Sequence, residues 1–201
     1  MSRSNRIGLY GGTFDPIHNG HLYVITELLE RDVVDQIILV PAGEPWLREN
    51  APVAAGEDRL KMCQLAVAEL DLGDEVLVNS IEIRRSGPSY TIDTVEALKA
   101  TYPNDKIVLI LGTDAHATID QWHRSDELKK LVEVLVIDRP DFPGSPTLDI
   151  DALNISATQV RAGDFDLLPP AVVTYIKERG LYASKWVSQG LNPDRSSSSS
   201  R

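Results

Sequence analysis

The sequence predicts an α/β fold, in which a doubly wound, mostly parallel sheet carries helices on both faces. Apolar, β-rich runs alternate along the chain with segments of helical periodicity, the order that produces βαβ units. Glycine and polar residues come directly after most of these runs, where ligands bind in such sheets. A chain of 201 residues with 42% hydrophobic content suits one domain. We expect that domain at residues 1–185 and a tail at 186–201 with a disordered, Ser-rich end.

The first unit is a strand at residues 7–10, a glycine turn and a helix. Gly11 and Gly12 permit a tight turn and a close approach of the backbone to a ligand. Asn19 is the predicted N-cap. Apolar residues at helical spacing follow it: Leu22, Val24, Ile25, Leu28 and Leu29. A helix that begins behind such a turn favours anions, because its free N–H groups and its dipole point outward.

The remaining elements follow from the same patterns. Strands are predicted at residues 36–40, 75–83, 106–111 and 131–137, with a short one at 149–153. Helices are predicted at residues 57–70, within the segment 84–98, from 156 onward and at 169–179. Pro170 suits the first turn of the last helix, and Gly180 suits its end. Three prolines make residues 41–56 a long irregular loop.

Composition narrows the classes of function. A net charge of −10 argues against general nucleic-acid binding, which needs a basic face. No apolar run approaches membrane-spanning length, and the N-terminus has no apolar signal core, so we expect a cytoplasmic protein without membrane association. The single cysteine, Cys63, excludes an intramolecular disulfide bond and fits a reducing compartment.

His18 and His21 lie three residues apart at the predicted turn. Two imidazoles beside a row of backbone amides indicate that the turn handles phosphates. The spacing differs from the Gly-x-Gly-x-x-Gly dinucleotide motif, and no Gly-Lys-Ser/Thr of a P-loop follows. A zinc site is the alternative, with His116 or His123 as a third ligand.

The segment Gly11-Gly-Thr-Phe-Asp-Pro-Ile-His-Asn-Gly-His21 resembles the signature of the nucleotidylyltransferase superfamily. That resemblance implies a Rossmann-like fold and a role for both histidines in stabilising phosphate during nucleotidyl transfer. Residues 155–161, Ile-Ser-Ala-Thr-Gln-Val-Arg, form a capping box on the residues alone. They also resemble the superfamily's Ile-Ser-Ser-Thr-x-x-Arg element, with Ala157 in place of the second serine, which implies that Arg161 neutralises phosphate charge.

Gly112-Thr-Asp114 followed by Trp122 resembles the nicotinate mononucleotide adenylyltransferases, in which the tryptophan stacks on the pyridine ring. On the residues alone, Asp114 could cap a helix and Trp122 could be core. The segment 89–94, Ser-Tyr-Thr-Ile-Asp-Thr, also resembles that family, although Thr91 or Asp93 could simply cap a helix.

The residues and the resemblance together predict three groups of site residues, with Arg48 included because an arginine on the 41–56 loop could reach a phosphate or could simply be solvated. The catalytic group is His18, His21 and Arg161. The ATP-binding group is Gly11, Gly12, Thr13, Phe14, Gly112, Asp114, Ser156 and Thr158. The group that binds nicotinate mononucleotide is Asp15, Arg48, Tyr90, Thr91, Trp122 and Arg139.

The implied reaction transfers AMP from ATP to nicotinate mononucleotide, with Mg²⁺ carried by the ATP phosphates. No nucleophile with a partnered base is evident, so direct in-line attack is expected. The alternatives are phosphopantetheine adenylyltransferase, an enzyme that prefers nicotinamide mononucleotide, and a catalytically silent nucleotide-binding regulator. The partners would be ATP and nicotinate mononucleotide, and a homo-oligomer is possible.

Overall fold

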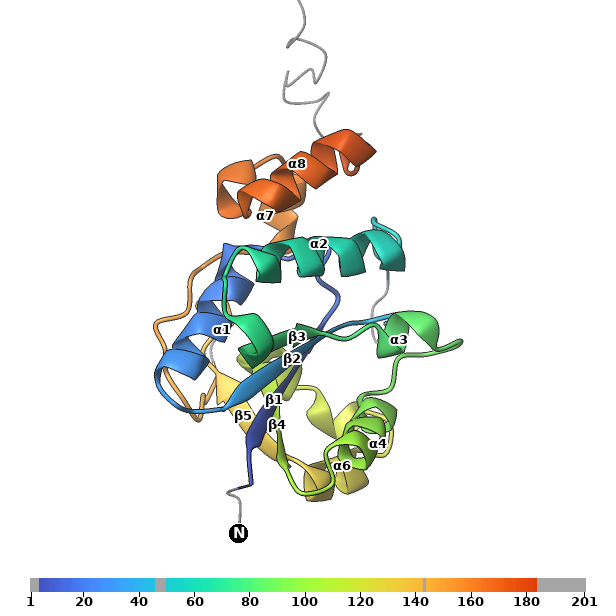
Figure 1. The fold of residues 1–201 in the computed structure, drawn as a ribbon, viewed down its shortest axis with the longest axis vertical. Helices are drawn as coiled ribbons and strands as arrows, with labels where there is room; N and C mark the ends of the chain where they lie inside the picture. The colour runs from blue at the N-terminus through green and yellow to red at the C-terminus, as the bar shows by residue number, and fades with distance from the viewer. Residues whose placement is uncertain (1–3, 46–49, 143, 184–201) are drawn as a thin grey trace, which may run out of the picture.

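Five parallel strands form one sheet in the order β3-β2-β1-β4-β5 (Figure 1). The computed structural model describes residues 4–45, 50–142 and 144–183. The strands are β1 (Arg6–Gly12), β2 (Gln36–Pro41), β3 (Val76–Val78), β4 (Lys106–Gly112) and β5 (Glu133–Ile137). The expected Rossmann-like parallel sheet is confirmed. The chain reverses its direction of growth between β1 and β4, which makes their carboxyl ends the expected ligand site.

Helices cover both faces of this sheet. The α-helices are α1 (Asn19–Glu30), α2 (Gly56–Ala68), α3 (Ile81–Arg84), α4 (Thr91–Thr101), α5 (Thr113–His116), α6 (Ser125–Leu131), α7 (Ala157–Arg161) and α8 (Pro170–Arg179). The short 3₁₀ turns are η1 (Gly73–Glu75), η2 (Ile119–Gln121) and η3 (Phe165–Leu167). In Figure 1, α1 and α2 lie on one side of the sheet and α4 and α6 on the other, while α7 and α8 stack beyond α2.

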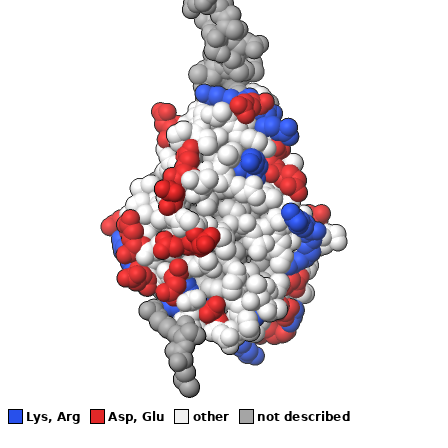
Figure 2. Space-filling model, in the orientation of Figure 1, with Lys and Arg blue, Asp and Glu red and all other residues white. Residues whose placement is uncertain are grey.

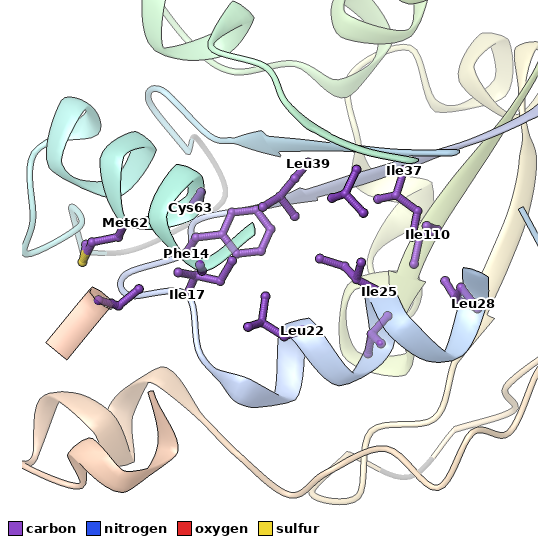
Figure 3. Packing of buried hydrophobic residues seen from close by; sticks show 14 of the residues in the cluster. Phe14, Ile17, Leu22, Ile25, Leu28, Ile37, Leu39, Met62, Cys63 and Ile110 are labelled. Atoms are coloured by element: carbon purple, nitrogen blue, oxygen red, sulfur yellow. The ribbon is translucent and has the colours of Figure 1, made fainter. Parts of the chain in front are cut away.

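Alternation along the strands divides the core into two clusters. In β2, Ile37 and Leu39 pack against α1 and α2, whereas Ile38 and Val40 face α4 and α6. Figure 3 shows Ile37 and Leu39 on the α1 side of the sheet. Full burial of each such side chain contributes about 1.5–3 kcal/mol. Because both faces are buried, a slip of one residue would exchange the two clusters, so the register of the sheet is strongly fixed.

One predicted strand is too long, and another does not form. The run 75–83 forms a strand only over Val76–Val78. Beyond it, the Asn79 side-chain carbonyl accepts a hydrogen bond from the Ile81 N–H (2.9 Å), which turns the chain into α3. Residues 149–153 form no strand: the N–H groups of Ile150 and Ala152 donate to the Asp138 carboxylate, each at 2.9 Å, instead of to a strand backbone.

Of the two capping residues predicted for helix ends, one is confirmed and one is not. The N-cap of α1 is His18, and Asn19 is already its first residue, so the N-cap prediction was wrong by one position. Gly180 ends α8 with a left-handed backbone (φ 61°), as predicted. The predicted tail at 186–201 lies outside the described residues.

Charged side chains are interspersed on the surface shown in Figure 2, where the described residues form no extended basic patch. Within the described ranges, no helix combines the length and the apolar character needed to cross a bilayer.

Candidate active site

A cavity of about 320 Å³ opens at the carboxyl ends of β1 and β4. Its walls come from the loops after β1, β4 and β5 and from the start of α7. The predicted site residues that line it are Gly11, Gly12, Thr13, Phe14, Asp15, His18, His21, Gly112, Asp114, Arg139 and Arg161. Segments separated by up to 150 positions in the sequence therefore meet in one place, at the sheet edge that the topology favours.

The glycine turn brings the backbone against an aromatic ring. A Cβ atom at Gly12 would lie 2.8 Å from Cζ of Phe14, a distance that real contacts do not allow. Phe14 is only 3% exposed, and its ring makes edge contacts with those of Tyr10 (5.8 Å) and His21 (5.0 Å). Phe14 thus supports the histidine from behind, while Gly12 leaves the backbone open to the cavity.

The two histidines form a stacked pair at the start of α1. Their ring centroids lie 3.6 Å apart, and the His18 backbone N–H donates to Nδ1 of His21 (3.2 Å). A neutral His21 therefore carries its proton on Nε2, where it can act as a donor.

Burial is the largest cause that lowers both histidine pKa values. The pKa of His18 falls to about 4, with the positive charge of Arg139 as the second cause. The pKa of His21 is lowered by burial, then by His18 and Arg139. Both rings are neutral near pH 7, and each offers a single N–H donor. The described residues place no group of three or more His, Cys, Asp or Glu side chains where it could hold a metal ion, so the zinc alternative gains no support from them.

Arg161 reaches the cavity from α7 and is held on two sides. Its Nη1 donates to the Asp15 carbonyl oxygen (2.6 Å), and its Nη2 donates to Oγ1 of Thr158 (3.1 Å). Ser156 forms the capping box: its Oγ accepts from the Gln159 N–H (3.3 Å), while its own N–H donates to Gln159 Oε1 (2.7 Å). Ser156 and Thr158 therefore flank the cavity wall and orient α7, and Arg161 supplies the charge.

An ion pair joins the ends of β4 and β5 at the cavity. Nη1 of Arg139 lies 2.6 Å from Oδ2 of Asp114. A Cβ atom at Gly112 would lie 2.6 Å from Oδ1 of Asp114, so only glycine lets this carboxylate fold back over the strand end. One acidic and one basic group thus stand together where the loops after β4 and β5 meet.

Five predicted site residues are not part of the cavity lining: Ser156 and Thr158, which flank it at the start of α7, and Tyr90, Thr91 and Trp122. Thr91 is the first residue of α4, and Tyr90, its N-cap, stacks on the ring of His123 (4.2 Å, 25°). The Trp122 Nε1–H donates to Oγ1 of Thr118 (3.4 Å), and its ring packs against the cluster beneath α4. Arg48 lies outside the described residues.

Two lining residues with polar side chains, Tyr10 and Asp138, were not predicted from the sequence. Tyr10 precedes the glycine turn and lines the cavity, and burial raises the pKa of its hydroxyl. Side chains alternate along β1, so Tyr10 points to the other face of the sheet from Leu9. This alternation could have identified Tyr10 from the sequence. Asp138 directly follows β5. The expectation that ligands bind at the carboxyl ends of strands, which pointed to Asp114, would also have pointed to Asp138.

Comparison with known proteins defines the class. The cytidylyltransferase-like family model matches residues 9–163, and the chain belongs to this family. A "Probable nicotinate-nucleotide adenylyltransferase" of Saccharopolyspora erythraea is 39% identical, over 95% of this chain and 96% of its own length. One of Bacillus pumilus is 36% identical, over 89% of this chain and 99% of its own.

The fold has a close counterpart among solved structures. The Plasmodium falciparum nicotinic acid mononucleotide adenylyltransferase, solved in complex with NaAD, has a TM-score of 0.72. It is 21% identical and covers 89% of this chain and 98% of its own. This structural similarity supports the fold alone, whereas the family model and the relatives are similarities of sequence.

Proposed function

We propose that this protein is a nicotinate-nucleotide adenylyltransferase, which transfers AMP from ATP to nicotinate mononucleotide and releases pyrophosphate. The observation that carries the proposal is the convergence of His18, His21 and Arg161 on one cavity at the β1/β4 strand ends. The names of the relatives support the choice of substrates.

The reaction forms a bond between an oxygen of the mononucleotide phosphate and the α-phosphorus of ATP, and breaks the bond from that phosphorus to the β-phosphate oxygen. The chain needs to position the two reactants and stabilise charge on phosphate oxygens. His21 is set up for this role, because the His18 N–H occupies its Nδ1 and leaves the Nε2–H free to donate. Arg161 would neutralise the charge that collects on the departing pyrophosphate.

Mg²⁺ is part of the proposal as a component of the MgATP substrate. The carboxylates that line the cavity are engaged within the chain: Asp114 pairs with Arg139, Asp138 accepts two backbone N–H groups, and Asp15 accepts hydrogen bonds through both of its oxygens. Such a lining suits an ion held mainly by phosphate oxygens and water.

Recognition of the pyridine ring is assigned to residues of the group predicted to bind nicotinate mononucleotide. Tyr90 and Trp122 both pack against the buried cluster on the α4 side of the sheet, and Thr91 is the first residue of α4. Backbone amides at the start of α4 suit a carboxylate, which supports nicotinate over nicotinamide as the preferred base. A cytoplasmic location belongs to the same proposal, because ATP is a substrate and the buried Cys63 is a free thiol.

The test is release of pyrophosphate from ATP and Mg²⁺ with three acceptors offered in parallel: nicotinate mononucleotide, nicotinamide mononucleotide and phosphopantetheine. We expect the highest kcat/KM with nicotinate mononucleotide. Release with another acceptor alone would keep the phosphate chemistry and overturn the role given to Trp122 and Thr91. ATP binding without release for any acceptor would favour the silent regulator. Light scattering on the same sample measures the molar mass in solution and so tests whether the protein forms a homo-oligomer.

A further inference from the structure

The carboxylate of Asp15 is occupied by the protein itself. It is 3% exposed and accepts from the Val53 N–H (2.8 Å), the Ala54 N–H (3.1 Å) and the Tyr182 hydroxyl (2.7 Å). Both oxygens are therefore engaged by segments far away in the sequence. The expectation that Asp15 binds the mononucleotide directly would require breaking these bonds, so its side chain is better suited to another task.

The backbone of Asp15 reaches the phosphate site through Arg161. The carbonyl oxygen accepts from Arg161 Nη1 at 2.6 Å, and the nearer carboxylate oxygen lies 3.9 Å from the same nitrogen. The Arg161 side chain is only 15% exposed, so its direction depends on these partners. A rotation of the Asp15 peptide would move the guanidinium within the cavity.

Tyr182 is the outermost member of this chain of contacts. It follows α8, is 5% exposed and has a left-handed backbone (φ 63°), which aims its hydroxyl inward at Asp15. It lies beyond residues 9–163, the part matched by the family model. The segment after α8 thus touches the glycine-rich loop directly.

We propose that Tyr182 and Asp15 are positioning residues that hold Arg161 in the direction needed to bind the phosphates of ATP. The inference rests on the proposed function for the role of Arg161 in turnover, and on the geometry alone for its role in ATP binding. The Tyr182 hydroxyl, at the C-terminal end of the domain, would then determine where the Arg161 guanidinium lies in the active site.

The experiment is a double-mutant cycle of Tyr182→Phe with Arg161→Lys. Loss of one buried hydrogen bond should lower kcat/KM for ATP about tenfold in the Arg161 protein. In the Arg161→Lys background, the same substitution should change it less than about twofold, because the group that Tyr182 positions is already altered. ATP dissociation constants for the four proteins give a second cycle that needs no turnover.

Tyr175→Phe is the matched control. Its hydroxyl, on α8, donates to Oδ1 of Asp58 (2.8 Å), away from the cavity. It should lower the melting temperature as Tyr182→Phe does, and leave kcat/KM unchanged. Asp15→Asn, a second variant of the same chain of contacts, should show the same coupling to Arg161.

Equal losses from Tyr182→Phe in both backgrounds, in turnover and in ATP binding, would overturn the proposal and leave a purely structural hydrogen bond. The proposed function has a separate readout, since a wild-type protein without adenylyl transfer would fail the acceptor test while the ATP-binding cycle still decides the role of Tyr182.

Discussion

Replacement of His18 by asparagine should make the fold less sensitive to acid. The His18 pKa is about 4 in the folded protein, against 6.5 for an ordinary histidine, mainly because the ring is buried. Below pH 6.5, His18 binds a proton in the unfolded chain but not in the folded protein. The free energy of unfolding therefore decreases as the pH falls from 6.5 to 4. Linkage gives a loss of about 2 kcal/mol from this residue between pH 7 and pH 5.

The assay is urea unfolding at pH 7 and at pH 5, followed by circular dichroism. The wild-type protein should lose about 2 kcal/mol more than His18→Asn over this interval, beyond any loss that carboxylates cause in both proteins. Asparagine keeps a polar side chain suited to the N-cap position of α1. His116→Asn, which removes an exposed imidazole outside the cavity, is the control. Equal acid losses in wild type and His18→Asn would refute the claim that burial keeps this ring neutral.

Three further substitutions test the site. His21→Ala should lower kcat by about 10²–10³-fold with little change in melting temperature, because it removes a donor to developing phosphate charge; near-normal turnover would remove it from the catalytic group. Trp122→Ala should raise the KM for nicotinate mononucleotide more than that for ATP, and steady-state kinetics with each substrate varied in turn would expose an unchanged constant. Gly12→Ala should weaken ATP binding and lower the melting temperature, since its Cβ would meet Phe14 at 2.8 Å; calorimetric titration showing wild-type affinity would contradict the close backbone approach.

Much of the fold is predictable because burial on both faces leaves a clear pattern. The strands β1, β2, β4 and β5 are apolar runs bounded by turn residues, and period-2 alternation predicts their two faces. The third strand was overextended because apolar, β-branched-rich residues stand on both sides of Asn79 and Ser80, at Val76–Val78 and again at Ile81 and Ile83. The strand ends before Asn79, because the side-chain carbonyl of that residue accepts a hydrogen bond from the Ile81 N–H and starts the turn into α3. A count of apolar residues does not show that this side-chain hydrogen bond competes with continuation of the strand.

The cavity was predictable from strand ends, but the use of each side chain was not. Asp15 carries the same chemistry whether it faces a substrate or the Tyr182 hydroxyl, and that partner lies 167 positions away. The same holds for Asp114, which pairs with Arg139 from the loop after the neighbouring strand β5. Motif spacing places such groups at the site, whereas their partners depend on tertiary contacts that only the structure supplies.

Cys63 offers a native reporter of opening in this core. It lies on α2 at 0% exposure, among the residues of the cluster in Figure 3, and burial raises the pKa of its thiol. A thiol reagent needs both access and the thiolate, so modification requires α2 to detach from the sheet. Because the chain has one cysteine, the labelling rate follows a single event. Labelling with and without ATP would therefore measure how strongly an occupied cavity holds the α2 layer closed, without any engineered probe.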